Sequence, residues 1–185
     1  MSLTDVNLSK KLTEIGSSAF YNCTALTGVI LPETLTSIGN SAFRYCTSLT
    51  DIVFHANLIT VENYAFANCE KLKDITFSDS QIQIGSYTFY NCDSIEKIEI
   101  KNNNEIGSYC FSNCNGITEI IIGDNVILND CVFSGCNSIK SLEIGQNLTK
   151  TDRSFSGINI EGECGVNLKW KAGMFGTPQR QTGYF

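Results

Sequence analysis

The sequence has little positive charge, a single histidine and no long hydrophobic run, and these absences narrow its possible functions. Its 13 Lys and Arg are outnumbered by 19 Asp and Glu, which gives a net charge of −6. Nucleic-acid binding needs a basic surface, so the composition argues against that class. No apolar run approaches the length of a membrane-spanning helix, so we expect no membrane insertion.

The residues that metal sites and catalytic sites need are also scarce. His55 is the only histidine, and none of the nine cysteines form a C-x-x-C pair. We therefore expect no metal and no cofactor. No Ser or Cys stands in a recognisable nucleophile motif. Carboxylates recur in regular columns, which is more typical of a soluble surface than of an acid–base pair, so we predict that the protein is not an enzyme.

A repeat fills most of the chain. The stretch from Ile38 to Phe54 has the pattern I-G-x-x-A-F-x-x-C-x-x-L-x-x-I-x-F, and copies of it follow one another in three steps of 23 residues and then three of 22. A fixed period in this range predicts a solenoid, in which each turn packs only on its neighbours. The phenylalanine that marks the register recurs at Phe20, Phe43, Phe66, Phe89, Phe111, Phe133 and Phe155.

Each repeat has two halves with different patterns. The second half alternates apolar and polar residues, as at Ile98 and Ile100, which predicts a short β-strand. The first half, from the glycine to the cysteine, is too short for an independent helix, so we expect a single helical or 3-10 turn held by packing. The sequence thus predicts an α/β solenoid.

Six of the nine cysteines occupy one slot of the repeat, three residues after the phenylalanine. A residue at a fixed slot points the same way in every turn, and free cysteine behaves as a small buried hydrophobe. We therefore predict a ladder of reduced, inward-facing thiols rather than a disulfide framework. Its members are Cys23, Cys46, Cys69, Cys92, Cys114 and Cys136.

The repeat resembles the BspA-like subclass of leucine-rich repeats. The resemblance lies in I-G-x-x-A-F-x-x-C-x-x-L-x-x-I-x-L-P at Ile15 to Pro32 and in its copies, from about Glu14 to Gly145. It implies a right-handed solenoid with a parallel β-sheet on the concave face and short helical or 3-10 turns on the convex face. It also implies a non-enzymatic binding module. Members are mostly cell-surface or secreted proteins of bacteria and some protists, linked to adhesion and host-protein binding.

We predict three segments. Residues 1–14 form an N-terminal partial repeat or cap, 15–160 the leucine-rich repeat solenoid of about seven repeats, and 161–185 a C-terminal cap or tail. The tail resembles no repeat and holds the only tryptophan, Trp170. An open solenoid end must be covered, which favours a cap. A peptide that docks on a partner is the alternative.

Two surfaces are candidates for protein binding. The first is the concave strand face, which is acidic with aliphatic residues and suits a partner with basic and apolar groups, although an ordinary solvated face has the same composition. Its residues are Asp51, Val53, Asp74, Thr76, Lys97, Glu99, Glu119, Ile121 and Glu143. The rival surface comprises a tyrosine stripe, for which self-stacking is the alternative, and the tail: Tyr64, Tyr87, Tyr109 and Trp170.

Two functions remain open. One is a protein-binding module from a cell-surface or secreted adhesion-type protein, and the other is an intracellular scaffold or assembly subunit. Met1 to Asp5 lack the basic start and apolar core of a signal peptide. We therefore expect a surface or secreted location if the chain is a fragment of a longer protein, and a cytoplasmic one otherwise.

Overall fold

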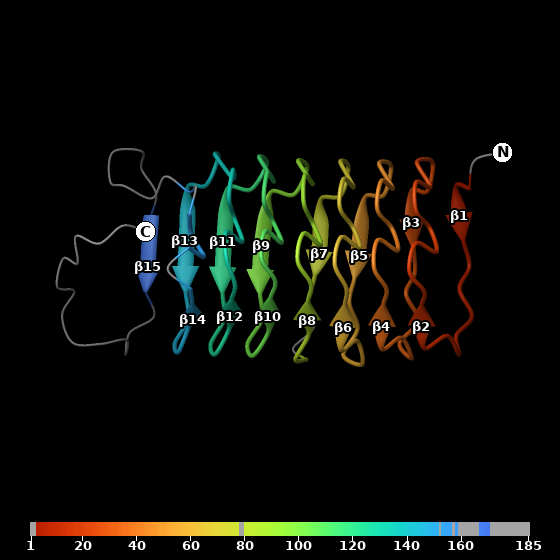
Figure 1. Ribbon diagram of the computed structural model, residues 1–185, viewed down its shortest axis with the longest axis horizontal. Coiled ribbons are helices and arrows are strands. Elements are labelled where there is room, and N and C mark those ends of the chain that lie inside the picture. The colour runs from red at the N-terminus through yellow and green to blue at the C-terminus, as the bar shows by residue number, and fades with distance from the viewer. Residues whose placement is uncertain (1–2, 78–79, 152, 157, 159–166, 171–185) are drawn as a thin grey trace.

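The computed structural model describes residues 3–77, 80–151, 153–156, 158 and 167–170. Two layers of parallel strands run along the molecule, with long strands directed down the page and short strands directed up it in Figure 1. The long-strand layer contains β1 (Asp5–Val6), β3 (Gly28–Val29), β5 (Asp51–Val53), β7 (Asp74–Thr76), β9 (Lys97–Ile100), β11 (Glu119–Ile122), β13 (Ser141–Ile144) and β15 (Asn167–Trp170).

The short-strand layer was not predicted. Its seven two-residue strands pair without interruption in the order β14-β12-β10-β8-β6-β4-β2. Two residues carry no periodicity, and the Ile-Gly dipeptides that end most of them suggested only the start of a turn. The strands are β2 (Glu14–Ile15), β4 (Ser37–Ile38), β6 (Thr60–Val61), β8 (Gln83–Ile84), β10 (Glu105–Ile106), β12 (Ile127–Leu128) and β14 (Thr149–Lys150).

The predicted helical or 3-10 turns are wrong, and with them the α/β class, because the described residues contain no helix. Alternate backbone amides donate to the next repeat rather than within their own turn. Ser18 N–H donates to Asn40 O (2.9 Å) and Phe20 N–H to Ala42 O (2.7 Å). The intervening amides close i−3 turns instead, as from Ala19 to Gly16 (3.2 Å). A helix would need these amides in one continuous ladder, so stacking replaces it.

The phenylalanines that mark the register form a column at the centre of the core. Adjacent rings from Phe20 to Phe155 lie parallel, with centroids 5.0 to 6.2 Å apart. The five rings from Phe43 to Phe133 have no exposed surface. Phe54 and Phe77 come from the long-strand side and pack against the column. The column therefore forms a continuous core between the two layers.

The thiol ladder faces inward, as predicted from its slot. Cys46, Cys69, Cys92, Cys114 and Cys136 are buried and Cys23, in the first full turn, is half-buried. Each buried thiol donates to the carbonyl oxygen of the phenylalanine one turn earlier, at 3.0 to 3.3 Å. Burial raises the pKa of Cys46 and of Cys136 to about 12. The described thiols thus act as small core groups that also satisfy a carbonyl.

The change of repeat length lies on one side of the coil only. From β6 to β7 the chain advances 14 residues (60 to 74), and from β10 to β11 it again advances 14 (105 to 119). From β5 to β6 it advances nine (51 to 60), but from β9 to β10 only eight (97 to 105). The turns beside the phenylalanines are therefore constant, and the connection after the long strand is what shortens.

The long-strand layer is divided at two places among the described residues, between β3 and β5 and, where this change occurs, between β7 and β9. β5 pairs with β7, and β9, β11, β13 and β15 form a four-stranded sheet, but no ladder joins β7 to β9 within the described residues. The short-strand layer continues past the same point through β8 and β10. The division is therefore local to the side of the molecule where the predicted contact residues lie.

Candidate binding surfaces

The residues predicted for the concave face occupy the outward positions of five long strands, and we call this set the long-strand face. Parallel register sets their spacing: Lys97 lies beside Glu119, which lies beside Ser141, and Asp51 lies beside Asp74. The intervening side chains, such as Ile98 and Ile120, point into the core. The face comprises Asp51, Val53, Asp74, Thr76, Lys97, Glu99, Glu119, Ile121 and Glu143.

The long-strand face changes character along the stack. At its N-terminal end Val53 is 47% exposed, and Ile30, in the corresponding position one turn earlier, is 85% exposed. Toward the C-terminus charged pairs take over: Lys97 Nζ lies 2.8 Å from Glu119 Oε1, and Lys101 Nζ lies 2.6 Å from Glu99 Oε1. An exposed aliphatic region therefore adjoins a region with carboxylates in excess.

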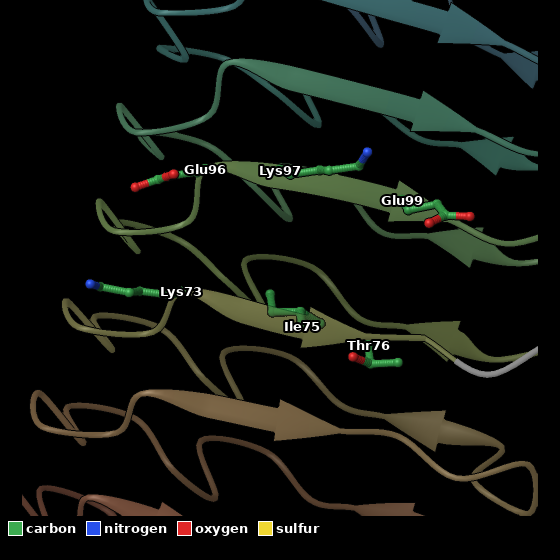
Figure 2. A pocket seen from close by; sticks show the side chains of 6 residues that line it. All are labelled: Lys73, Ile75, Thr76, Glu96, Lys97 and Glu99. Atoms are coloured by element: carbon green, nitrogen blue, oxygen red, sulfur yellow. The ribbon is translucent and has the colours of Figure 1, made fainter.

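A hollow of about 310 Å³ opens between β7 and β9, where the ladder is missing. Ile75 lines it and is half-buried, whereas its counterparts Ile52 and Ile98 are buried. In Figure 2 the Lys97 side chain runs along β9 and turns its amino group away from β7. The pair with Glu119 holds it there, and the hydrogen bond to Glu119 raises the pKa of Lys97. The hollow gives the face a depression with an apolar floor and a charged rim.

The rival tyrosine stripe is a stack of parallel rings on the turn side. Centroids of Tyr64 and Tyr87 lie 4.9 Å apart, as do those of Tyr87 and Tyr109, with planes within 6°. Tyr90 meets the edge of Tyr87 at 5.8 Å. The Cys131 thiol follows Tyr109 and raises the pKa of its hydroxyl through a side-chain hydrogen bond. The faces of the middle ring are covered by its neighbours, so the stack offers ring edges and hydroxyls to a partner.

Arg44 extends this stack toward the N-terminus, which sequence reasoning missed. Its guanidinium carbon lies 4.9 Å from the Tyr64 ring centroid and 5.0 Å from that of Tyr45. Tyr45 in turn meets Tyr21 edge to face at 5.7 Å. All the tyrosines that the structure describes therefore join one cluster. We call it the tyrosine–arginine ribbon: Tyr21, Arg44, Tyr45, Tyr64, Tyr87, Tyr90 and Tyr109.

Several ribbon tyrosines sit in left-handed backbone conformation. Tyr45, Tyr64, Tyr87 and Tyr109 have φ between 58° and 64°. Most L-residues adopt this region at a cost of roughly 1–2 kcal/mol, while asparagine and glycine tolerate it better. A stacked aromatic pair returns about 0.5–1.5 kcal/mol. Stacking therefore offsets most of the backbone cost and leaves little net gain, so stability alone is a weak reason for tyrosine here.

Tyr45 could have been found by comparing the residues at one slot of the repeat. The slot two residues after the phenylalanine holds Asn22, Tyr45, Asn68, Asn91, Asn113 and Gly135, all with positive φ. Tyrosine is the exception in a column of residues that suit such a backbone. Nothing in the sequence marked the hollow, because it depends on a missing strand pairing.

The remaining predicted site lies mostly outside the described residues. Residues 161–166 and 171–185 of the predicted cap or tail are among those not described. The backbone of Asn167–Trp170 is described as β15, which pairs in parallel with β13, Trp170 lying beside Ile144. The tail thus adds one strand to the long-strand layer.

The remaining groups to consider are possible metal ligands, membrane-spanning helices and thiols. Among the described residues no group of three His, Cys, Asp or Glu side chains is placed to hold a metal ion. The described part of the chain also contains no helix long and apolar enough to cross a membrane. Raised thiol pKa values, as at Cys46 and Cys136, describe unreactive core groups rather than nucleophiles.

Comparison with known proteins identifies the repeat. The sequence matches the family model of the BspA type leucine rich repeat region in six copies, over residues 1–115 and 36–161. Its structure is similar to the crystal structure of a leucine-rich repeat protein from T. pallidum, with 28% identity and a TM-score of 0.68, covering 77% of this chain and 72% of that one. No curated protein matches the sequence.

Two further solved structures are similar over most of the chain. A leucine-rich repeat protein from Bacteroides ovatus has 18% identity and a TM-score of 0.47, covering 91% of this chain and 66% of that one. A leucine rich cell surface protein from Faecalibacterium prausnitzii has 20% identity and a TM-score of 0.35, covering 93% and 80%.

Proposed function

This chain belongs to the BspA-type leucine-rich repeat family, and we propose that it is a non-enzymatic protein-binding module that uses the long-strand face. One observation carries the proposal. The strand register presents outward side chains at fixed spacing on a layer whose inward side chains are committed to the core. A rigid sheet loses little freedom when it binds, so several weak contacts can add up.

The composition of the face indicates what kind of partner would fit it. Its nine positions hold five carboxylates and one lysine, with Val53 and Ile121 among the apolar residues. Lys97 is paired with Glu119, so the positive charge on the face is already neutralised. A partner with basic groups beside aliphatic or aromatic ones fits this surface, and its association should slow as salt screens the attraction.

The family resemblance, rather than the geometry, supports a cell-surface or secreted location and an adhesion role. An intracellular scaffold is the second candidate, and the row of reduced core thiols is compatible with it. Fractionation of the source cells with an antibody to this chain separates the two, because an adhesion protein appears at the surface or in the medium.

Selection from a random peptide library displayed on phage tests the binding face. We expect peptides enriched on the immobilised chain to carry Lys or Arg beside apolar residues. Binding should be lost in a double Glu99→Lys and Glu119→Lys variant and weakened at high salt. Both side chains are substantially exposed, so the variant should fold.

The matched control reverses two carboxylates elsewhere. Glu33 and Glu70 are exposed and lie outside the long-strand face. A double Glu33→Lys and Glu70→Lys variant changes the net charge equally and should keep peptide binding. If no peptide is enriched, or if both variants behave alike, the long-strand face is not the contact surface.

A further inference from the structure

The turn side carries a second surface whose chemistry is opposite to that of the long-strand face. We propose that the tyrosine–arginine ribbon binds an acidic segment of a protein partner, with Arg44 receiving a carboxylate and the flanking tyrosines holding the segment's backbone and apolar groups. This proposal does not depend on the long-strand face.

Arg44 is the reason to expect an anion. Its guanidinium lies between the rings of Tyr45 and Tyr64, at 5.0 and 4.9 Å from their centroids. The hydrogen bond from an Arg44 Nη to the Tyr45 hydroxyl is long, at 3.4 Å. Its Nε is buried with no hydrogen-bond partner, and no described carboxylate lies within ion-pair distance. Two rings thus fix a cation whose hydrogen-bonding capacity is largely unused.

The tyrosines make the surroundings suitable for recognition. Tyrosine and arginine are the residue types enriched where binding energy concentrates in protein interfaces. Tyr21, at the end of the ribbon, is 47% exposed, and the other rings are half-buried. Their rotamers are restricted by stacking before any partner arrives, so little side-chain freedom is lost on binding.

Backbone geometry supports a role beyond folding. Four ribbon tyrosines occupy left-handed positions where other turns place asparagine, serine, cysteine or glycine. Sparsely populated backbone conformations in unsuited residues concentrate at functional sites. In the slot of Tyr64, Tyr87 and Tyr109 the earlier turns have Ser18 and Ser41, so the stack tolerates a small residue there.

The overall charge works against an acidic partner, so Arg44 must select one locally. The chain has a net charge of −6, so a general electrostatic attraction would favour basic partners everywhere on its surface. Only a local, geometrically defined cation can select an acidic segment against that background. A planar guanidinium held between rings is suited to bidentate binding of a carboxylate, which lysine cannot match.

Nuclear magnetic resonance of the isotope-labelled full chain tests this directly. The probe is a Glu-rich peptide with a single Tyr, compared with the same peptide in which every Glu is Gln. We expect the Glu peptide to shift the Arg44 Nε–Hε signal and the ribbon tyrosine signals, and to bind about tenfold more tightly than the Gln peptide, a difference of about 1.4 kcal/mol.

Four variants separate a charge-specific site from a general apolar one. Arg44→Gln should abolish the preference for the Glu peptide, Arg44→Lys should retain only part of it, and Lys140→Gln, which removes an exposed positive charge outside the ribbon, should leave it intact. Tyr21→Ser, at an exposed ring, should weaken both peptides without disturbing the fold. Circular dichroism checks folding of each variant.

Several results would overturn the proposal. Equal affinity for the two peptides would show an apolar surface rather than an acid-binding one. An Arg44 signal that shifts with protein concentration alone would identify a second copy as the occupant. Peptide-induced shifts confined to β9 and β11 would place acidic binding on the long-strand face and would contradict the proposed function as well, whereas a silent Arg44 alone would leave that function standing.

Discussion

The turns with 23-residue spacing and those with 22-residue spacing build two versions of the same coil. In the first version the long strands β3, β5 and β7 have two or three residues and pair only in twos. In the second, β9, β11 and β13 have four residues each and form one continuous sheet. The phenylalanine column and the short-strand layer continue through both.

The connection after the long strand accounts for part of the difference. In the 22-residue turns Asn103, Asn125 and Asn147 stand at its tip with φ of 53° to 60°. Their side chains form a ladder, with Asn125 donating to Asn103 at 3.2 Å and Asn147 to Asn125 at 3.0 Å. The shorter connection thus has an asparagine turn that hydrogen-bonds between repeats. The length of this connection can change without altering the turns that carry the core.

The largest effect should be the same in both versions. Phe66→Ala and Phe111→Ala each remove a fully buried ring from the shared column, so each should cost about 3–5 kcal/mol of unfolding free energy. Urea unfolding followed by circular dichroism measures both. A cost at Phe111 several kcal/mol larger than at Phe66 would show that the continuous sheet, rather than the column, carries the stack.

High pH should weaken both versions through the thiol ladder. The folded-state pKa of Cys46 and of Cys136 is raised by burial to about 12, above the value for an exposed thiol. The stability that the neutral thiols contribute is complete below the unfolded-state pKa of about 8.5 and is lost as pH rises toward 12. Each such thiol should remove about 1.4 kcal/mol per pH unit in that window.

Urea unfolding between pH 7 and 10 in reducing buffer tests this, and Cys110→Ala is the matched variant. Burial also raises the pKa of Cys110, whose slot is filled by Ala19, Ala42 and Ala65 in earlier turns. The unfolding free energy of the variant should fall less steeply as the pH rises, by the contribution of one thiol. A flat profile would mean that the thiols are solvated or oxidised, which thiol counting with and without denaturant would reveal.

The asparagine ladder should distinguish the two versions. Asn125→Ala removes two inter-turn hydrogen bonds and a residue suited to positive φ, so it should cost about 1–3 kcal/mol. Asn125→Gly removes only the hydrogen bonds and should cost less than Asn125→Ala, since glycine adopts this φ without strain. Chemical denaturation of the pair measures the difference, and equal losses would indicate that backbone strain plays no part.

The smallest effects should have opposite signs in the two versions. Glu119→Gln breaks the ion pair with Lys97. The side chains of Lys97 and Glu119 are 51% and 40% exposed, so the loss should destabilise the fold by less than about 1 kcal/mol. Asp51→Asn should stabilise slightly, because Asp51 is exposed and the change removes one negative charge from a chain that already carries an excess of them. Thermal unfolding at low and at high salt measures both differences, and high salt should reduce them. Effects of the same sign would contradict an electrostatic cause.

Much of the fold could be predicted because a repeated residue reports its environment several times. The phenylalanine and cysteine columns identified the core, and alternation such as Ile98 and Ile100 identified the long strands. The two-residue strands and the left-handed turns escaped prediction because they are fixed by hydrogen bonds to the next repeat, not by local pattern. Arg44 escaped because its role comes from rings one turn apart.

If the long-strand face is the contact surface, a partner should bind across the boundary between the two versions. Hydrogen–deuterium exchange of the full chain, with and without the tightest basic peptide from the phage selection, measures this most directly. We expect slower exchange in β5, β7, β9 and β11, on both sides of the hollow lined by Ile75 and Lys97. Protection confined to the turn side around Arg44, or to β15, would contradict it.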